Sequence, residues 1–398
     1  MNYRDIPPAG AKISVLGMGC MRLPLLKAAD GSVNNNLVDE EATSLLVQKA
    51  TDAGVNYFDT AYPYHGGNSE IAMGKALKPL KRSDFYLTTK LPMWLVKSPD
   101  DVERFLTEQL ERLQMDYVDF YFFHGLNRDT WQLVKELKLI EPMERMRAKG
   151  LIKNIGFSFH DGVSVFKEIV DGYDQWAISQ IQLNYMDANY QAGLEGLRYA
   201  GKKGIGVVAM EPLKAGTLVR QEDMPRDVKK LFADSPVQQD YVSWALRWLF
   251  HQPELTTAIC GMTTPEQLET DLKAVDGVVP GCMSEQELDT IEQVYRAYSK
   301  LTRVRCSACA YCMPCPCGVD IPNVFRSYNY ATLYINANEP GNDICLQYLN
   351  TVNNGHGADQ CVKCGRCEKR CPQHIEIIQE LASAHEYLMG QCSELGVR

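Results

Sequence analysis

Two runs of cysteines in the C-terminal part of the sequence carry its most specific chemical signal. The second run has the spacing by which bacterial ferredoxins bind [4Fe–4S] clusters. It reads Cys361-x-x-Cys364-x-x-Cys367-x-x-x-Cys371-Pro372. The first run has one residue fewer before its last cysteine and reads Cys306-x-x-Cys309-x-x-Cys312-x-x-Cys315-Pro316. Two such runs predict two [4Fe–4S] clusters, and therefore a protein that handles electrons or works beside one that does.

The order of these cysteines also predicts which of them share a cluster. In two-cluster ferredoxins the fourth cysteine of each run binds the other cluster. One predicted ligand set is therefore Cys306, Cys309, Cys312 and Cys371. The other set is Cys361, Cys364, Cys367 and Cys315. Because the first run is short by one residue, Cys317 competes with Cys315 as the fourth ligand of the second set.

Disulfide bonds and zinc are the alternatives for these cysteines. Disulfides need an oxidising compartment, and the segment from Met1 to Asp5 lacks the basic start and apolar run of an export signal. Structural zinc would use pairs of Cys-x-x-Cys, but it does not explain the proline after each run. We therefore favour iron–sulfur clusters and keep zinc as the alternative. The cysteines without ligand spacing are expected to be small buried residues: Cys20, Cys260, Cys282, Cys345 and Cys392.

A second group of four residues could together protonate a carbonyl group during hydride transfer: Asp59, Tyr64, Lys90 and His124. A tyrosine can donate a proton, but its ordinary pKa near 10 makes it slow unless its surroundings lower that pKa. A lysine ammonium stabilises the phenolate, and an aspartate holds the lysine charged and in place. A histidine can orient the carbonyl oxygen. Singly, each residue has an ordinary structural role, so the prediction depends on their convergence.

The first 285 residues or so alternate between short β-branched or aromatic runs and amphipathic stretches such as 100–113, which follows Ser98-Pro99. The expected strands are 13–18, 56–61, 85–91, 118–123, 154–159, 177–183, 206–210 and 257–261. Eight strand–helix units over about 250 residues predict a (β/α)8 barrel, whose active site lies where the strands end. Strands two, three and four would then bring the four residues to one mouth. An open dinucleotide-binding sheet is disfavoured, because Gly17-x-Gly19 is not completed to G-x-G-x-x-G.

The expected fold class is therefore α/β. We expect a (β/α)8 TIM barrel over residues 1–285, a bridging helix at 286–300, and a small, mainly α-helical ferredoxin-like domain at 301–398. A domain of about 100 residues has a modest core, so two bound clusters would contribute much of its folding stability.

In order and spacing, Asp59-Thr60-Ala61 with Tyr64, then Lys90, then His124, resembles the catalytic tetrad of the aldo-keto reductases over residues 10 to about 280. The resemblance implies that Tyr64 is the general acid, that Lys90 and Asp59 tune it, and that His124 orients the carbonyl. It also implies a nicotinamide cofactor, NADP(H) or NAD(H), extended across the barrel mouth. The positions that match the family's cofactor contacts are Ser158, Gln180, Met210, Glu211, Pro212, Leu213, Gly216, Gly261, Met262, Thr263 and Gln267.

The sequence departs from the family pattern at two places. Many members stack an aromatic ring on the nicotinamide after strand seven, where this chain has Met210, which can still pack on a ring. The loop after strand eight often holds the 2′-phosphate of NADP with cations, but here it has Gln267 and Asp271. Preference for NADP therefore does not follow from the sequence. The cations that could replace the missing ones are Lys202, Lys214 and Arg220.

Over its whole length the chain resembles a bacterial and archaeal subgroup of the aldo-keto reductases that has a C-terminal 4Fe–4S ferredoxin-type domain. Segments typical of that subgroup are 156–160 (GFSFH), 210–212 (MEP) and 311–316 (YCMPCP). An NAD(P)-dependent enzyme that reduces a small carbonyl compound is the function this resemblance implies, with clusters that transfer electrons or are structural. The alternatives are a ferredoxin-linked electron-transfer enzyme and a non-catalytic regulatory subunit that senses nicotinamide.

The composition of the chain limits the kinds of partner that the protein is expected to bind. A net charge of −9 argues against nucleic acid and against an anionic membrane surface. No apolar stretch approaches the roughly 20 residues that span a bilayer. We expect a cytoplasmic protein with a small-molecule carbonyl substrate, and a ferredoxin or other electron carrier is a candidate partner. Trp94, four residues beyond Lys90, is the best candidate to line the substrate pocket, ahead of Tyr62 and Trp131.

Overall fold

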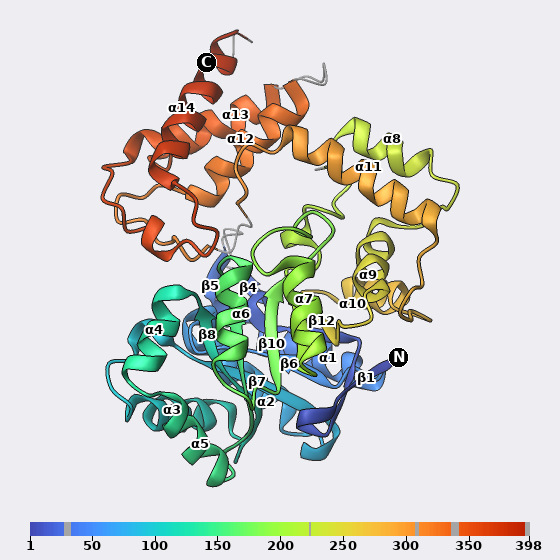
Figure 1. Ribbon diagram of the computed structural model, residues 1–398. Coiled ribbons are helices and arrows are strands. Elements are labelled where there is room, and N and C mark those ends of the chain that lie inside the picture. The colour runs from blue at the N-terminus through green and yellow to red at the C-terminus, as the bar shows by residue number, and fades with distance from the viewer. Residues whose placement is uncertain (28–32, 223, 307–309, 336–341, 395–398) are drawn as a thin grey trace. The chain divides into compact units, whose positions relative to one another are not determined.

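The computed structural model describes residues 1–27, 33–222, 224–306, 310–335 and 342–394 (Figure 1). The chain divides into two compact units. The first contains Met1–Leu213 and Gln239–Met283, and the second contains Lys214–Gln238 and Ser284–Arg398. The domain bounds at 285 and 300 therefore stay a prediction, and the segment Lys214–Gln238 groups with the C-terminal part of the chain, which the sequence did not indicate.

The first unit is built on a closed barrel of eight parallel strands in the order β10-β11-β12-β3-β6-β7-β8-β9. Their bounds are β3 Leu16–Gly19, β6 Tyr57–Asp59, β7 Tyr86–Leu91, β8 Val118–Leu126, β9 Ile152–Phe159, β10 Ile178–Gln182, β11 Gly206–Met210 and β12 Thr257–Cys260. Most of their residues are buried, as expected for parallel strands that are covered on both faces. The predicted α/β barrel is confirmed.

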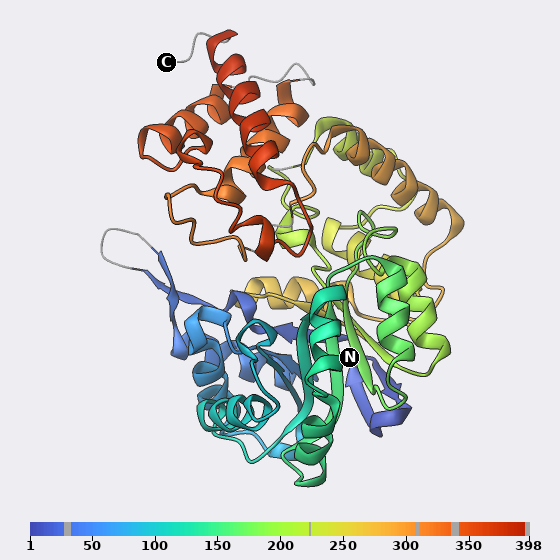
Figure 2. The same cartoon turned by 60° about the vertical axis from the view of Figure 1, so that its left-hand side comes forward.

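A short antiparallel hairpin precedes the barrel, formed by β1 (Tyr3–Ile6) and β2 (Ala11–Ser14) (Figure 2). Its residues Ile6, Ala11 and Ile13 pack with side chains from the N-terminal halves of barrel strands, among them Tyr57 and Ile178. The hairpin therefore fills the end of the barrel opposite the predicted active site.

The predicted strand 13–18 is wrong as one element, because it spans the end of β2 and the start of β3. The chain changes sheets at Val15. Its N–H donates to Asn2 O (2.9 Å), and its carbonyl accepts from Ala258 N (2.9 Å) in the barrel. A continuous apolar run cannot show this change of partner.

Helices surround the barrel (Figure 1). They are α1 Glu40–Asp52, α2 Asn68–Leu77, α3 Asp101–Leu113, α4 Arg128–Glu136, α5 Ile140–Ala148, α6 Val163–Asp171, α7 Gly193–Lys202, α9 Tyr241–His251 and α10 Pro265–Ala274. Several begin at side-chain caps: Asp39 accepts from Ala42 N, and Asn127 forms a capping box with Thr130. A second hairpin, β4 (Leu25–Lys27) with β5 (Val33–Val38), follows the first barrel strand.

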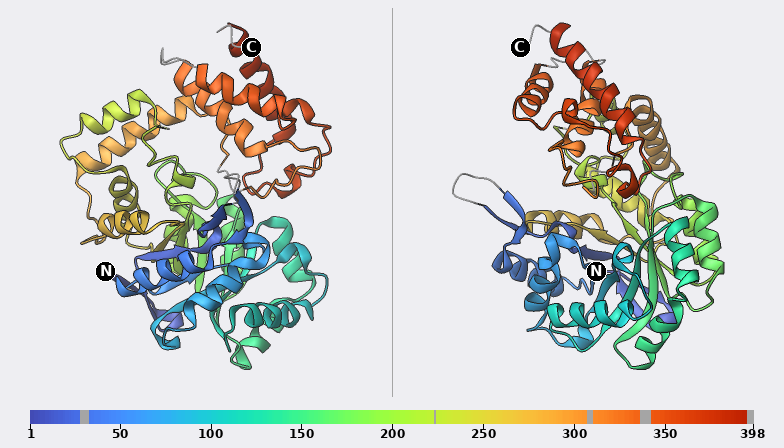
Figure 3. Two further views of the ribbon diagram at one scale, coloured as in Figure 1. Left: turned by 180° about the vertical axis from the view of Figure 1, so that it is seen from behind. Right: turned by 90° about the vertical axis from the view of Figure 1, so that its left-hand side faces the viewer.

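In the second unit the described residues are helical or irregular, as the predicted mainly helical domain requires. The helices are α8 Arg226–Ala233, α11 Glu285–Leu301, α12 Ile321–Ile335, α13 Asn342–Asn353 and α14 Ile377–Glu394. Helix α11 starts with a capping box between Ser284 and Glu287 and packs against α8. Helices α12, α13 and α14 pack on one another around Phe325, Tyr348 and Leu381 (Figure 3). Of all the helices described, none is long and apolar enough to cross a membrane.

Candidate active site and cluster site

A buried ion pair lies at the ends of β6 and β7, which are hydrogen-bonded neighbours in the barrel. Lys90 Nζ lies 2.6 Å from Asp59 Oδ1 and donates a second hydrogen bond of 2.8 Å to Thr60 O. Both side chains are only 1% exposed. Burial raises the pKa of the Asp59 carboxyl, and the charge and hydrogen bond of Lys90 oppose that rise. The ammonium group is thus held at a fixed point of the barrel mouth.

Tyr64 lies beside this pair, directly before a sharp turn of the backbone. His65, Gly66 and Gly67 all have positive φ (53°, 64° and 95°). Glycine adopts such angles most readily, and it occupies two of the three positions. At Gly67 a Cβ atom would lie 2.9 Å from Arg112 Nη1, so a larger residue would displace the end of that side chain. The turn leaves the Tyr64 ring buried beside the ammonium, with Lys90 Nζ 5.0 Å from the ring centroid.

His124, near the end of β8, completes the group. Its ring is nearly perpendicular to that of Tyr64 (84°), with the two centroids 6.0 Å apart. Burial lowers the pKa of His124 well below its ordinary value, and the charges of Lys90 and His160 lower it further. The imidazole is therefore neutral near pH 7 and can donate one hydrogen bond. All four residues that the sequence singled out lie together at one end of the barrel.

Trp94 lies over this group, in the short 3-10 turn Met93–Leu95 that follows β7. Its ring centroid is 5.2 Å from that of His124, while 55% of the residue remains exposed. Trp131, by contrast, is buried against Trp176 (6.3 Å), and Tyr62 packs on Phe105 (5.2 Å). Among the three aromatic candidates, Trp94 is the one beside the four reactive residues.

A buried polar network lies behind Lys90, and no local sequence pattern indicates it. Gln109 Nε2, from α3, donates to Lys90 O (3.0 Å) and to Glu70 Oε1 (2.7 Å). The same carboxylate accepts from Thr89 Oγ1 (2.6 Å), and Tyr121 OH donates to Gln109 Oε1 (2.8 Å). Burial raises the pKa of Glu70, and these hydrogen bonds oppose the rise. The network ties α2, α3 and β8 to the strand that carries the lysine.

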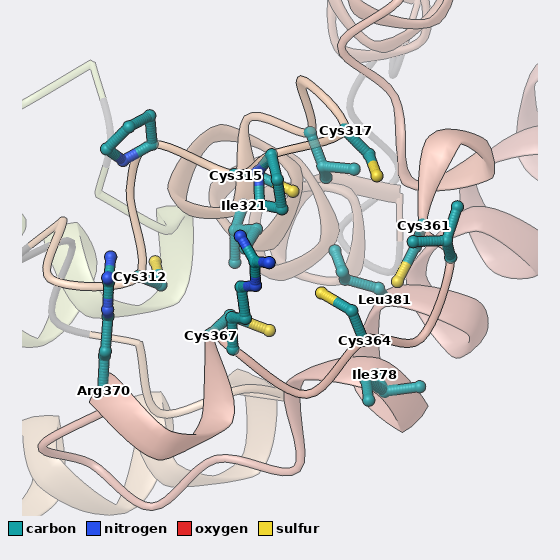
Figure 4. Close-up of a pocket in the computed structure, with 15 residues that line it drawn as sticks. Cys312, Cys315, Cys317, Ile321, Cys361, Cys364, Cys367, Arg370, Ile378 and Leu381 are labelled. Carbon is teal, nitrogen blue, oxygen red and sulfur yellow. The ribbon is translucent and has the colours of Figure 1, made fainter.

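The predicted cluster ligands line two cavities of the second unit. The larger, about 360 Å³, is bordered by a ring of cysteines from both runs (Figure 4). They are Cys312, Cys315, Cys317, Cys361, Cys364 and Cys367. The cavity has room for a body larger than one ion. Across the part of the chain that is described, no three His, Cys, Asp or Glu side chains are placed to hold a single metal ion.

The smaller cavity, about 20 Å³, is lined by Cys306, Cys312 and Cys371 among other residues. Cys309, predicted as the fourth ligand there, lies outside the described residues. The larger cavity is thus lined by the second predicted ligand set, and the smaller by the described members of the first set. Cys312 is the exception, because it borders both cavities. Cys315 and Cys317 line the same cavity, so the competition between them stays open. Thiolate sulfurs around an enclosed space are the donor set that an iron–sulfur cluster needs.

The cysteines outside the two runs behave largely as expected. Cys20, Cys260, Cys345 and Cys392 are buried, whereas Cys282 is only half-buried. Among the cysteines that the structure describes, none forms a disulfide bond.

Comparison with known proteins identifies both parts of the chain. The model of the aldo/keto reductase family matches residues 15–296. The protein belongs to the aldo/keto reductase family. A second model, for a 4Fe-4S dicluster domain, matches residues 305–376, so this aldo/keto reductase carries an iron–sulfur domain C-terminal to its barrel.

Relatives of this aldo/keto reductase have several described roles. It is 28% identical to L-galactose dehydrogenase of Arabidopsis thaliana, over 76% of this chain and 97% of that protein. It is 27% identical to a probable voltage-gated potassium channel subunit beta of the same plant, over 75% and 98% of the two chains. A thermostable aldo-keto reductase solved in complex with the inhibitor epalrestat is 27% identical, with a TM-score of 0.59 over 74% of this chain and 100% of that one.

Three of the matched cofactor positions lie in neighbouring strands of the reductase barrel. Ser158 (β9) is buried, and its Oγ accepts a hydrogen bond from Gly125 N (2.8 Å). Gln180 (β10) is buried next to Asp59, and its amide lowers the pKa of that carboxyl. Met210, at the end of β11, packs against the barrel interior. Gln180 is therefore the one of the three that adjoins the Lys90–Asp59 pair.

The matched positions after β11 and β12 in the first unit are Glu211, Pro212, Leu213, Gly261, Met262, Thr263 and Gln267. A cation that the sequence did not reveal lies among them. Arg22 Nη2 pairs with Glu211 Oε1 (3.1 Å), and the Arg22 side chain lies against Gly261, where a Cβ would be 3.3 Å from Arg22 Cβ. No local spacing indicates this, because Arg22 and Glu211 are 189 residues apart.

Gln267 and Asp271, the residues that stand where the family often has cations, have other contacts. Gln267 Oε1 accepts from Thr263 N (2.8 Å) at the start of α10. Asp271 is buried beside Cys260, and burial raises the pKa of its carboxyl to about 7. Asp271 therefore does not present a fixed negative charge at the surface of this loop.

Gly216 and two of the candidate cations belong to the second unit. Lys214 and Arg220 line a cavity of about 340 Å³ there, together with Asn323 and Arg326 of α12. Lys202 lies at the end of α7 in the first unit and does not border this cavity. Of the three cations proposed as substitutes, Lys214 and Arg220 thus share one cavity.

Proposed function

We propose that this aldo/keto reductase reduces a small aldehyde or ketone with NADPH or NADH, and that Tyr64 donates the proton. The observation that carries the proposal is the buried Lys90–Asp59 pair, held by two hydrogen bonds beside the Tyr64 ring. A full cation fixed next to a phenol favours the phenolate that remains after proton transfer.

The roles of the side chains follow from their placement. The nicotinamide, when bound, supplies the hydride that goes to the carbonyl carbon. Tyr64 OH gives its proton to the carbonyl oxygen, so that the product is an alcohol. Lys90 stabilises the charge left on Tyr64, and Asp59 keeps the ammonium in position. Neutral His124 donates a hydrogen bond to the same oxygen and orients it.

The residues of the barrel mouth fit a dinucleotide. Gln180 presents an amide beside Asp59, and Ser158 presents a hydroxyl, both suited to a carboxamide group. Arg22, held by Glu211 beside Gly261, offers a cation to a phosphate. Because that cation is partly neutralised by Glu211, we propose that the enzyme accepts both NADP(H) and NAD(H).

For the second unit we propose two [4Fe–4S] clusters. One would be held by Cys306, Cys309, Cys312 and Cys371, and the other by Cys361, Cys364, Cys367 and Cys315. Clusters of this kind exchange one electron at a time, so an external single-electron carrier is their natural partner. Cysteines outside disulfide bonds suit a reducing compartment, and we place the protein in the cytoplasm.

A regulatory subunit is the second candidate, favoured by the likeness to a probable potassium channel subunit beta. Such a protein would bind nicotinamide without needing turnover. The buried Lys90–Asp59 pair argues against this role, because burying two charges costs several kcal/mol and binding alone does not require them.

Tyr64→Phe tests the choice between the two. The variant keeps the ring and its packing but cannot donate a proton. We expect NADPH and NADH to bind as to the wild type in fluorescence titrations, while reduction of a panel of aldehydes and ketones falls by about a hundredfold or more. Equal turnover by the variant, or no turnover by either protein, would contradict the proposed role of Tyr64.

A further inference from the structure

The nine residues Val362–Arg370, which we call the basic segment, carry four positive charges between the predicted cluster cysteines. They are Lys363, Arg366, Lys369 and Arg370, and all four are exposed. The protein as a whole has a net charge of −9, so this concentration of cations runs against its overall charge. The one acidic residue of the segment, Glu368, accepts a hydrogen bond from Ile378 N (2.9 Å) in the first turn of α14.

Within the described ranges, none of these four side chains forms an ion pair or a hydrogen bond with another residue. Other surface cations of the protein are paired, for example Lys75 with Glu40 (2.7 Å) and Lys203 with Asp171 (2.8 Å). Four unpaired like charges in one short segment repel one another, and their own fold does not neutralise them. They therefore present a positive field to solvent.

The basic segment also borders the larger cysteine cavity. Arg366 and Arg370 line that cavity, and in Figure 4 Arg370 stands on the side of Cys312. Cys364 is exposed, and its neighbour Val362 is 66% exposed. Positive φ at Lys363 (56°) and Gly365 (72°) makes this a tightly turned loop rather than a helix. An apolar side chain, an exposed ligand cysteine and four cations thus share one surface.

We infer that the basic segment is the docking surface for an acidic protein that carries single electrons. The inference rests on the proposed clusters, because it makes the cluster of the larger cavity the entry point for electrons. Cations steer a partner of opposite charge and raise the rate of encounter, while the exposed Val362 supplies an apolar contact. Transfer complexes of this kind are small and transient, so nine residues can supply a large part of one side.

The electron balance of the step is simple. The reduced carrier loses one electron, the cluster beside Cys364 gains it, and no covalent bond forms or breaks. Nucleic acid and anionic membranes also bind cations, but the remaining surface of a chain with net charge −9 would repel such extended polyanions. A compact acidic protein, by contrast, can contact the basic segment without contacting the remaining surface.

The test is the rate at which a reduced acidic [2Fe–2S] ferredoxin reduces the clusters of the holoenzyme, followed anaerobically by stopped-flow absorbance at several salt concentrations. We expect a second-order rate constant that falls at least tenfold between about 50 and 500 mM salt. Replacing two cations that do not line the cavity, as Lys363→Gln with Lys369→Gln, should lower the low-salt rate roughly tenfold and flatten its salt dependence.

Lys78→Gln with Lys81→Gln is the control, because it removes the same number of exposed lysines from the first unit. This pair should keep the wild-type rate. A rate that is independent of salt and equal in all three proteins would overturn the inference. Dithionite, a small reductant, distinguishes failure of the docking surface from failure of the proposed clusters. If dithionite reduces the clusters while the rate with ferredoxin does not depend on salt, the docking surface is wrong and the clusters are present. If iron and sulfide are absent from the purified protein, the proposed clusters fail instead.

Discussion

Lys90 Nζ lies 2.6 Å from Asp59 Oδ1 at a point of the barrel from which solvent is excluded. The two residues belong to neighbouring parallel strands, β6 and β7, and the pair exists because the barrel brings both strand ends to one mouth. Breaking a buried pair leaves one charge without compensation, which costs more than the pair itself contributes.

The first prediction concerns the stability cost of breaking this pair. Asp59→Asn should lower the free energy of unfolding of the barrel by about 3 to 5 kcal/mol, because the Lys90 ammonium would remain buried without its counter-ion. Thermal unfolding followed by circular dichroism measures the change. Glu40→Gln, which breaks the exposed pair with Lys75, is the control and should cost less than about 1 kcal/mol. Equal losses in the two variants would contradict the buried-pair account.

The second prediction concerns pH. Burial lowers the pKa of His124 in the folded protein, so below the ordinary value of about 6.5 the unfolded chain takes up a proton that the folded one refuses. Stability from this residue is therefore present above pH 6.5 and lost as pH falls.

Between pH 7.5 and 5.5 the wild type should lose about 1 kcal/mol more unfolding free energy than His124→Gln, which has no titrating ring. Denaturant unfolding at a series of pH values measures both slopes. Parallel pH dependences would show that His124 titrates normally in the folded state.

The third prediction concerns the network behind Lys90. Gln109→Leu removes the donor to Lys90 O and leaves the Glu70 carboxylate with fewer hydrogen bonds. We expect a loss of about 2 kcal/mol in stability and a lower kcat, since the strand that holds the ammonium would loosen. Tyr121→Phe is a milder control, because it removes one hydrogen bond to Gln109 and keeps the ring. A fully stable Gln109→Leu variant with unchanged kcat would show that the network neither stabilises the barrel nor supports catalysis.

Much of the barrel could be predicted from local sequence, because buried parallel strands are continuous apolar runs with helical stretches between them. Seven of the eight expected strands coincide with observed ones to within a few residues. Asp59, Tyr64, Lys90 and His124 were found because residues at and just after strand ends converge in any such barrel. The left-handed turn at 65–67, directly after Tyr64, was not predicted from the sequence.

What the sequence did not reveal depends on contacts between distant residues. Arg22 meets Glu211 across 189 positions, and Gln109 meets Lys90 through a helix–strand contact. The segment Lys214–Gln238 groups with the second unit because α8 packs on α11, which no local pattern indicates. The hairpin at the N-terminus was missed because its second strand merges with the apolar run of β3.

The fourth prediction distinguishes Cys315 from Cys317, which line the same cavity. If Cys315 is the fourth ligand, Cys315→Ser should reduce the iron content of anaerobically purified protein from about eight to about four atoms per chain, whereas Cys317→Ser should keep about eight. Iron and acid-labile sulfide assays, with low-temperature EPR after reduction, provide the count. The reverse pattern would assign the ligand to Cys317.

The fifth prediction concerns Arg22 and the cofactor. Arg22→Gln removes the cation beside Gly261 and should weaken binding of NADPH about tenfold, with a smaller effect on NADH, which lacks the 2′-phosphate. Lys202→Gln, which removes a cation at the end of α7, should leave both affinities unchanged. Fluorescence titration gives the dissociation constants. Equal weakening of both nucleotides would place Arg22 at the shared pyrophosphate instead, and no weakening would remove it from the cofactor site.

The most direct measurement of the central claim follows the hydride itself. Anaerobic holoenzyme would be mixed with NADPH or NADH carrying deuterium at C4 and with a panel of aldehydes and ketones, and the products analysed by mass spectrometry and NMR. We predict an alcohol with deuterium on the former carbonyl carbon, formed by the wild type and lost in Tyr64→Phe. Nucleotide binding without deuterium in any product would contradict a carbonyl reductase and favour the regulatory role.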